Sequence, residues 1–117
     1  MSSLSFKQGD VVIADVRYSN FETSKYRPAL VASSDSYNRT GDDIILIKIT
    51  SKIKNRPFDI LLNPADLEFG RMKVAGVIKS DFLIVMEKKL IRFVVGKVKQ
   101  EVVQQVKNKL KEIFYIN

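Results

Sequence analysis

The sequence predicts a mainly β protein, a small barrel or sandwich of short strands that ends in one packed helix. Two observations favour this fold class. Runs of β-branched and apolar residues recur up to position 98, and glycine, proline, asparagine or aspartate stand between them. From position 99 onward the apolar residues take the period of an amphipathic helix. The 117 residues contain no repeat and no linker, so we expect one domain over residues 1–117.

The first strand is expected at residues 11–16, directly after the Gly9-Asp10 turn signal. Pro28 opens the second strand at residues 29–33, where a missing N–H disturbs the sheet least. Residues 18–26 between the two strands are polar and predict a loop of functional length.

Further elements follow in order along the chain. Residues 34–43 are rich in turn formers and predict a turn-rich connection with its tip at residues 38–42. Asn63 and Pro64 begin a short helical element, because asparagine caps and proline suits a first turn. Gly96 is expected to end the last strand. Strands are predicted at residues 44–49, 58–62, 74–78, 82–86 and 90–95, with 74–78 and 82–86 possible halves of one bent strand.

The C-terminal helix is expected over residues 99–115. Its apolar residues form one stripe along the helix, with lysine and glutamate on the other face. The stripe consists of Val102, Val103, Val106, Leu110, Ile113 and Phe114.

The composition indicates an anionic partner. Twenty Lys and Arg residues stand against 13 Asp and Glu, which gives a net charge of +7 and a pI near 9.7. Such a basic domain most often binds nucleic acid. Cysteine and histidine are absent, which excludes disulfides, cysteine–zinc sites, Ser-His-Asp hydrolysis and histidine-pair RNA cleavage. We expect no metal and no cofactor.

Membrane segments are not expected. No apolar run approaches the ~18–20 residues that span a bilayer, and the N-terminus lacks the apolar region of a signal peptide. The sequence therefore favours a soluble, cytoplasmic protein.

Positive charge concentrates after the strand predicted at 44–49. Four cations and no acid occupy residues 48–56, beside the hydroxyls of Thr50 and Ser51. Proteins position phosphates with lysine and arginine side chains next to hydroxyl groups. Aromatic residues near loops can stack on unpaired bases. The expected nucleic-acid contacts are Ser51, Lys52, Lys54, Arg56, Lys25, Tyr26 and Lys79.

Several short motifs in a fixed order resemble one family. They are Gly9-Asp10-Val11-Val12, Arg27-Pro28-Ala29-Leu30-Val31, Ile49-Thr50-Ser51, Leu90-Ile91 and Val95-Gly96-Lys97-Val98, followed by a helix. This set is similar to the MazF/PemK family of toxin endoribonucleases, over roughly residues 8–115.

The resemblance implies a small SH3-like (MazF/CcdB-like) barrel with a C-terminal α-helix, commonly a homodimer. It also implies metal-independent cleavage of single-stranded RNA within a type II toxin–antitoxin system. The expected partner is a cognate MazE-like antitoxin, which inserts an acidic, flexible segment into the RNA groove.

By the same resemblance, Arg27 and Thr50 are the catalytic candidates. Arg27 would hold the phosphate, and Thr50 would bind the phosphate or support Arg27. An arginine stays protonated at neutral pH and is a poor proton acceptor, so Glu22 is expected to be the general base or to orient Arg27. A plain loop salt bridge is the alternative for Glu22. For Arg27 the alternative is an ordinary surface arginine before a strand-opening proline, and for Thr50 it is a β-forming residue at the end of a strand.

Two other functions fit the same composition. One is a non-catalytic toxin of the same fold that binds DNA gyrase, as CcdB does. The other is a general RNA-binding barrel without enzymatic activity. Arg27 and Thr50 argue against the first, because a pure binder has no need of that pair.

Overall fold

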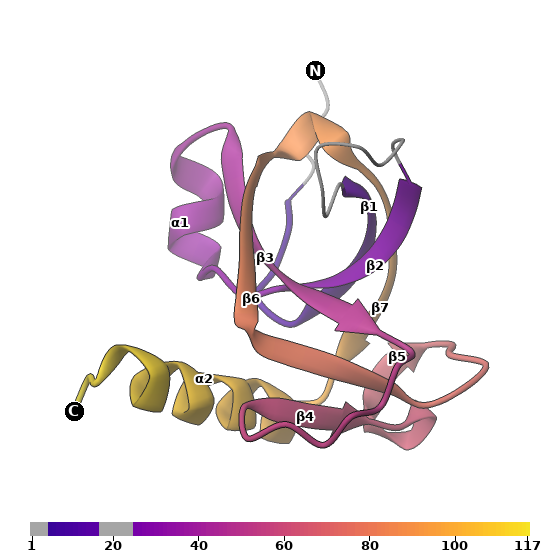
Figure 1. The fold of residues 1–117 in the computed structure, drawn as a ribbon. Coiled ribbons are helices and arrows are strands. Elements are labelled where there is room, and N and C mark those ends of the chain that lie inside the picture. The colour runs from indigo at the N-terminus through magenta and orange to yellow at the C-terminus, as the bar shows by residue number, and fades with distance from the viewer. Residues whose placement is uncertain (1–4, 17–24) are drawn as a thin grey trace.

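Among the residues that the structure describes, seven antiparallel strands form one curled sheet, and a C-terminal helix packs against it (Figure 1). The computed structural model describes residues 5–16 and 25–117. Across the sheet the strands lie in the order β4-β6-β3-β2-β1-β7-β5. They are β1 (Asp10–Val16), β2 (Lys25–Val31), β3 (Asp43–Thr50), β4 (Asp59–Leu62), β5 (Leu67–Gly70), β6 (Gly76–Glu87) and β7 (Ile91–Val98). The helices are α1 (Asp35–Thr40) and α2 (Gln100–Phe114), with 3-10 turns at Pro64–Asp66 and Lys88–Leu90. The predicted fold class is confirmed.

Both faces of the central strands are buried, which explains why their sequences are continuous apolar runs. Neighbouring residues in a strand point to opposite faces. Leu46 and Ile47 of β3 are both completely buried, yet they belong to two different core clusters. One cluster lies under α2, and the other lies among the curled strands and includes Phe6. Full burial of each such side chain stabilises the fold by about 1.5–3 kcal/mol.

Helix α2 confirms the predicted C-terminal helix. Val102, Val103 and Val106 are buried in the first core cluster, and Leu110 packs against it. Phe114, at the end of the predicted stripe, is 57% exposed. The stripe therefore extends past the part of the helix that the sheet covers. Within residues 5–16 and 25–117, no helix is both long and apolar enough to cross a membrane.

Strand β6 is the bent strand that the sequence allowed at residues 74–86. Ile49 of β3 lies opposite Ile78, whereas Ile47, two residues away, lies opposite Leu83. The extra residues of β6 between these pairs form an irregularity that bends the strand. Its first half therefore pairs with β4 and the end of β3, and its second half pairs with the rest of β3.

The structure adds one helix to the predicted elements and moves the start of one strand. Residues 34–43 contain helix α1, whose N-cap Ser34 accepts a hydrogen bond from the Tyr37 N–H at 3.1 Å. Such capping stabilises a short helix that apolar periodicity cannot reveal. Lys25 and Tyr26 belong to β2 rather than to a loop, and the rest of the predicted loop lies outside the described residues.

Strand β5 and the end of β7, residues 96–98, were also missed, because their pairing depends on two glycines. Gly70 and Gly96 lie opposite each other in the β5–β7 ladder. Gly70 has a φ of +98°, and a Cβ there would lie 2.4 Å from the Val95 carbonyl oxygen. Only glycine permits this approach of two backbones. Gly96 therefore lies inside a strand that continues to Val98, and does not end it.

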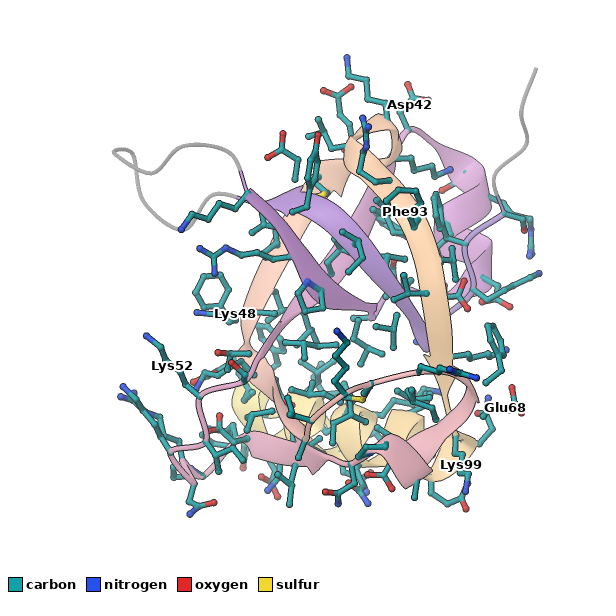
Figure 2. The ribbon with its side chains drawn as sticks, turned by 90° about the vertical axis from the view of Figure 1, so that its right-hand side faces the viewer. Asp42, Lys48, Lys52, Glu68, Phe93 and Lys99 are labelled. Carbon is teal, nitrogen blue, oxygen red and sulfur yellow. The ribbon has the colours of Figure 1, made fainter. Side chains whose placement is uncertain are left out.

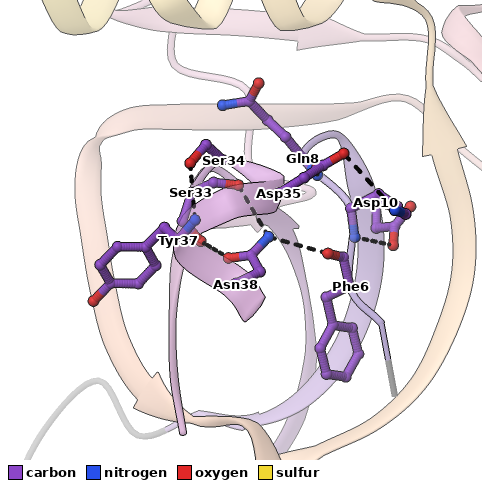
Figure 3. A network of polar contacts seen from close by, with 9 residues as sticks. Phe6, Gln8, Asp10, Ser33, Ser34, Asp35, Tyr37 and Asn38 are labelled. Atoms are coloured by element: carbon purple, nitrogen blue, oxygen red, sulfur yellow. Dashed lines mark hydrogen bonds and ion pairs between the residues drawn. The ribbon is translucent and has the colours of Figure 1, made fainter. Parts of the chain in front are cut away.

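A buried polar network attaches α1 to the sheet (Figure 3). Asn38 is 3% exposed, and its amide donates to the carbonyl oxygens of Phe6 at 3.2 Å and Ser33 at 3.1 Å. Its side-chain oxygen accepts from the Ser33 hydroxyl. That hydroxyl oxygen in turn accepts from the Ile45 N–H of β3 at 3.1 Å. The network thus links the N-terminal segment, α1 and β3.

Substitution of Asn38 by alanine is predicted to destabilise the fold by about 2–4 kcal/mol, because buried partners lose their hydrogen bonds. The exposed Arg39 on the same helix provides the control, and Arg39→Ala is expected to change stability by no more than about 0.5 kcal/mol. Urea unfolding followed by circular dichroism measures both. Equal stabilities of the two variants would show that the network does not hold α1.

Candidate functional site

The register of two neighbouring strands brings Arg27 and Thr50 to the same region. Strands β2 and β3 pair in the register Ala29↔Lys48, Leu30↔Ile47 and Val31↔Leu46, and the ladder ends there. One further step of two residues would place Arg27 opposite Thr50. Both side chains therefore point to the same face of the sheet. Figure 1 shows β2 and β3 separating beyond the end of this ladder.

An open hollow of about 450 Å³ occupies the space between the separating strands. We call it the Arg27 hollow. Arg27 and Thr50 are each half-buried at its wall, so both are accessible to a ligand and neither lies beneath the core. Its lining residues are Arg27, Pro28, Lys48, Ile49, Thr50, Ser51 and Lys52.

Thr50 ends β3 with its hydroxyl already partly oriented. Its Oγ1 accepts a hydrogen bond from the backbone N–H of Lys52 at 3.2 Å. A hydroxyl that accepts one hydrogen bond keeps its own O–H as a donor. Thr50 can therefore donate to an anion in the Arg27 hollow while the turn that begins the basic loop stays formed.

A second, strongly basic pocket of about 280 Å³ adjoins the Arg27 hollow and shares Lys48, Thr50 and Lys52 with it. We call it the Asp59 pocket, after the one acid among its lining residues. The lining residues are Lys48, Thr50, Lys52, Lys54, Arg56, Asp59 and Lys79. The five cations and one carboxylate leave a local charge of +4. Such a concentration of charge attracts phosphates.

Asp59 is the acid in this pocket, and it is almost fully covered. Its Oδ1 lies 2.8 Å from the Lys79 Nζ, and the two side chains are 7% and 17% exposed. Its Oδ2 accepts from the Arg56 N–H at 3.2 Å. Burial acts to raise the pKa of Asp59, but the hydrogen bonds from Lys79 and Arg56 outweigh it and hold the pKa below its usual value. Asp59 is therefore ionised in the folded protein at neutral pH.

A third pocket, about 230 Å³ in volume and mostly apolar, is also lined by Thr50. It shares Pro28, Ile49, Thr50 and Ser51 with the Arg27 hollow. Its rim carries Arg71 and Lys73. Thr50 therefore lines all three pockets, of which the Asp59 pocket is strongly basic and the third is mostly apolar.

The predicted site residues fall into two groups. Arg27, Thr50, Ser51, Lys52, Lys54, Arg56 and Lys79 all line the Arg27 hollow or the Asp59 pocket. Lys25 and Tyr26 lie at the start of β2 and line neither of them. The Tyr26 ring is 59% exposed, and the Arg92 guanidinium lies 5.2 Å from its centre. Glu22 lies outside the described residues.

The structure adds two residues that the predicted set omitted. Lys48 lies on the wall shared by the hollow and the pocket, with its Nζ 4.9 Å from the centre of the Phe82 ring. Asp59 joins through its ion pair with Lys79 across the β4–β6 ladder. The basic run 48–56 included Lys48, so charge alone could have indicated it. No sequence pattern indicated Asp59, because its ion-pair partner Lys79 is 20 residues away along the chain.

The donors at this surface suit a phosphodiester. An arginine presents a planar fork of donors to two phosphate oxygens, and ammonium groups add positive charge. Among residues 5–16 and 25–117, no group of three or more aspartate or glutamate side chains is placed to hold a metal ion. The cations and hydroxyls that line the Arg27 hollow and the Asp59 pocket offer anion binding and hydrogen-bond donation.

Comparisons with known proteins bear on the same region. A model of the PemK-like, MazF-like toxins of type II toxin–antitoxin systems matches residues 7–114. This range includes every described residue of the three pockets. No curated protein matches the chain.

Solved structures share the fold at low sequence identity. A mycobacterial endoribonuclease in complex with its cognate antitoxin is 18% identical with a TM-score of 0.77, over 95% of this chain and 96% of that one. A MazE–MazF structure from Deinococcus radiodurans is 24% identical with a TM-score of 0.77, over 97% and 98% of the two chains. MazF alone from that organism is 23% identical with a TM-score of 0.74, over 94% and 96%. With a family match over nearly its whole length, the chain belongs to the PemK-like, MazF-like toxins of type II toxin–antitoxin systems.

Proposed function

We propose that this toxin is a metal-independent endoribonuclease, which cleaves single-stranded RNA by attack of a ribose 2′-OH on the adjacent phosphate. The observation that carries the proposal is the shared hollow of Arg27 and Thr50. Structural neighbours that are endoribonucleases support it. The reaction needs neither a protein nucleophile nor a metal, which agrees with a chain that lacks cysteine and histidine.

The reaction requires four contributions from the protein: an in-line 2′-OH, an acceptor for its proton, stabilisation of the extra phosphorane charge and a proton for the leaving 5′ oxygen. Arg27 supplies two donors to the phosphate oxygens, and Thr50 supplies a hydroxyl donor. Lys48 and Lys52, on the same wall, add positive charge. Glu22 is proposed to accept the proton or to orient Arg27.

The RNA strand is proposed to follow the basic surface on either side of the cleaved phosphate. The Asp59 pocket offers Lys52, Lys54, Arg56 and Lys79 to flanking phosphates. Lys25 and Tyr26, at the start of β2, are proposed to contact the strand beyond the Arg27 hollow. The exposed ring of Tyr26 offers a face on which an unpaired base can stack.

The proposed partners follow from the same surface. An acidic, flexible segment of a cognate MazE-like antitoxin would compete with RNA for these cations, and antitoxin complexes among the structural neighbours support this. A homodimer would place two sets of Arg27 and Thr50 along one groove. Phe93 and Val85, each 61% exposed, offer apolar area that such a dimer could cover. Because its substrate would be messenger RNA, we propose that the toxin acts in the cytoplasm.

One prediction of this proposal concerns catalysis. Purified protein is expected to cleave a long single-stranded RNA in the presence of EDTA. Arg27→Ala is expected to lower the rate by about 10²–10³-fold, because a donor to the transition state is lost. The control is Arg39→Ala, which removes the same charge from the exposed end of α1 and is expected to retain full activity.

Two outcomes would contradict this mechanism. Near-normal cleavage by Arg27→Ala would remove Arg27 from it. Intact RNA after incubation with the wild-type protein would favour a non-catalytic toxin or a general RNA-binding barrel, which a gyrase-binding assay would separate.

Another prediction of this proposal concerns the basic loop. Replacing Lys52, Lys54 and Arg56 together by glutamine is expected to weaken RNA binding and to reduce the slope of log affinity against log salt by about 2, since each lost phosphate contact contributes ~0.7 for a single strand. Replacing Lys107, Lys109 and Lys111 on α2 removes the same charge and is expected to leave the slope unchanged. Equal effects of the two triple variants would show that only net charge matters.

A further inference from the structure

We propose that Asp59 is a positioning residue for RNA binding: it holds the Lys79 ammonium at the wall of the Asp59 pocket, aimed at a phosphate. This inference rests on the proposed RNA binding and goes beyond it, since it gives a role to an acid inside a basic site. A carboxylate among five cations would ordinarily repel RNA. The geometry around Asp59 indicates the opposite effect.

The contact with Lys79 is short and shielded. Asp59 begins β4, and Lys79 lies directly opposite it in the β4–β6 ladder. Their charged atoms are 2.8 Å apart, and both side chains are largely covered. A lysine side chain in open solvent samples many rotamers, whereas this one is held between two strands. An ammonium has three donors and Asp59 accepts from one, so two N–H groups remain for other acceptors.

The same carboxylate also closes the basic loop. Its Oδ2 accepts from the Arg56 N–H at 3.2 Å, and the Asp59 N–H donates to the Arg56 carbonyl oxygen at 3.0 Å. One side chain thus fixes the end of the loop that carries Lys52 and Lys54, as well as Lys79 on the neighbouring strand. The arrangement places cations from two separate parts of the chain around one pocket.

Asp59→Asn distinguishes a positioning role of Asp59 from a purely electrostatic one, because the two roles predict opposite changes in the affinity for RNA. Asparagine has nearly the same shape and still accepts from the Arg56 N–H, but it lacks the charge that holds Lys79. If Asp59 only repels RNA, the substitution strengthens binding. If Asp59 positions Lys79, the substitution weakens binding even though the net charge of the protein becomes more positive.

The experiment measures the affinity of single-stranded RNA with 2′-O-methyl groups at every ribose, which cannot be cleaved by 2′-OH attack. Asp59→Asn is expected to bind about tenfold more weakly, as for the loss of one hydrogen bond to a charged group. Its salt slope is expected to fall by about 0.7. Asp42→Asn changes the net charge equally at the far end of the molecule (Figure 2) and is expected to bind as tightly as the wild type. Tighter binding by Asp59→Asn would overturn the proposal.

A double variant shows whether Asp59 acts through Lys79. Lys79→Gln is expected to weaken binding about tenfold, and adding Asp59→Asn is expected to change this by less than about twofold, because both substitutions remove the same contact. Full additivity would overturn the proposal. If Asp59→Asn does not fold, as judged by thermal unfolding, Lys79→Gln is compared with Lys89→Gln, an exposed lysine that is also paired with an acid. Equal losses of RNA affinity in these two variants would show that Asp59 neutralises Lys79 rather than positions it.

Binding to the uncleavable RNA separates this proposal from the proposed enzymatic activity. If the wild-type protein binds the strand but does not cut natural RNA, the nuclease mechanism fails and the role of Asp59 can still be measured. If the wild-type protein does not bind RNA, the positioning role fails as well. Normal binding and cleavage by Asp59→Asn would overturn only the positioning role.

Discussion

The site depends on the register of β2 against β3 and on where their ladder ends. The last pair of the ladder is Ala29 with Lys48. The next residue outward on β2 is Pro28, which has no N–H to donate to a neighbouring strand. Beyond this point the strands separate, and the Arg27 hollow lies between them. A shift of one residue would move Arg27 or Thr50 to the opposite face of the sheet. The buried Leu30 and Ile47, which pair in the same ladder, resist such a shift.

The core and the site therefore place different demands on the same strands. β3 buries Leu46 and Ile47 on opposite faces, and directly after them it presents Lys48 and Thr50 to the hollow. Cations gathered in one place repel one another and lower stability. The buried carboxylate of Asp59 offsets part of this repulsion while leaving the pocket strongly positive. The fold thus tolerates a charge concentration that suits a polyanion.

The sequence predicted the elements whose signals are local. Apolar runs indicated most strands, the apolar stripe indicated α2, and ordered motifs indicated Arg27 and Thr50. It did not predict β5, because its pairing depends on the contact of Gly70 with Gly96, nor α1, whose signals are a serine cap and a buried asparagine. It also missed Asp59, since its contact with Lys79 depends on the register of β4 against β6. The role of Glu22 stays a prediction.

The central claim is that Arg27 and Thr50 flank a phosphate attacked by the neighbouring 2′-OH. It is tested most directly by an RNA in which one ribose, on the 5′ side of a mapped cleavage site, is replaced by 2′-deoxyribose. The account predicts that cleavage at that bond disappears, and that unmodified RNA yields a 2′,3′-cyclic or 3′-phosphate and a 5′-hydroxyl. Continued cleavage at the substituted position, or products with a 3′-hydroxyl and a 5′-phosphate, would contradict it.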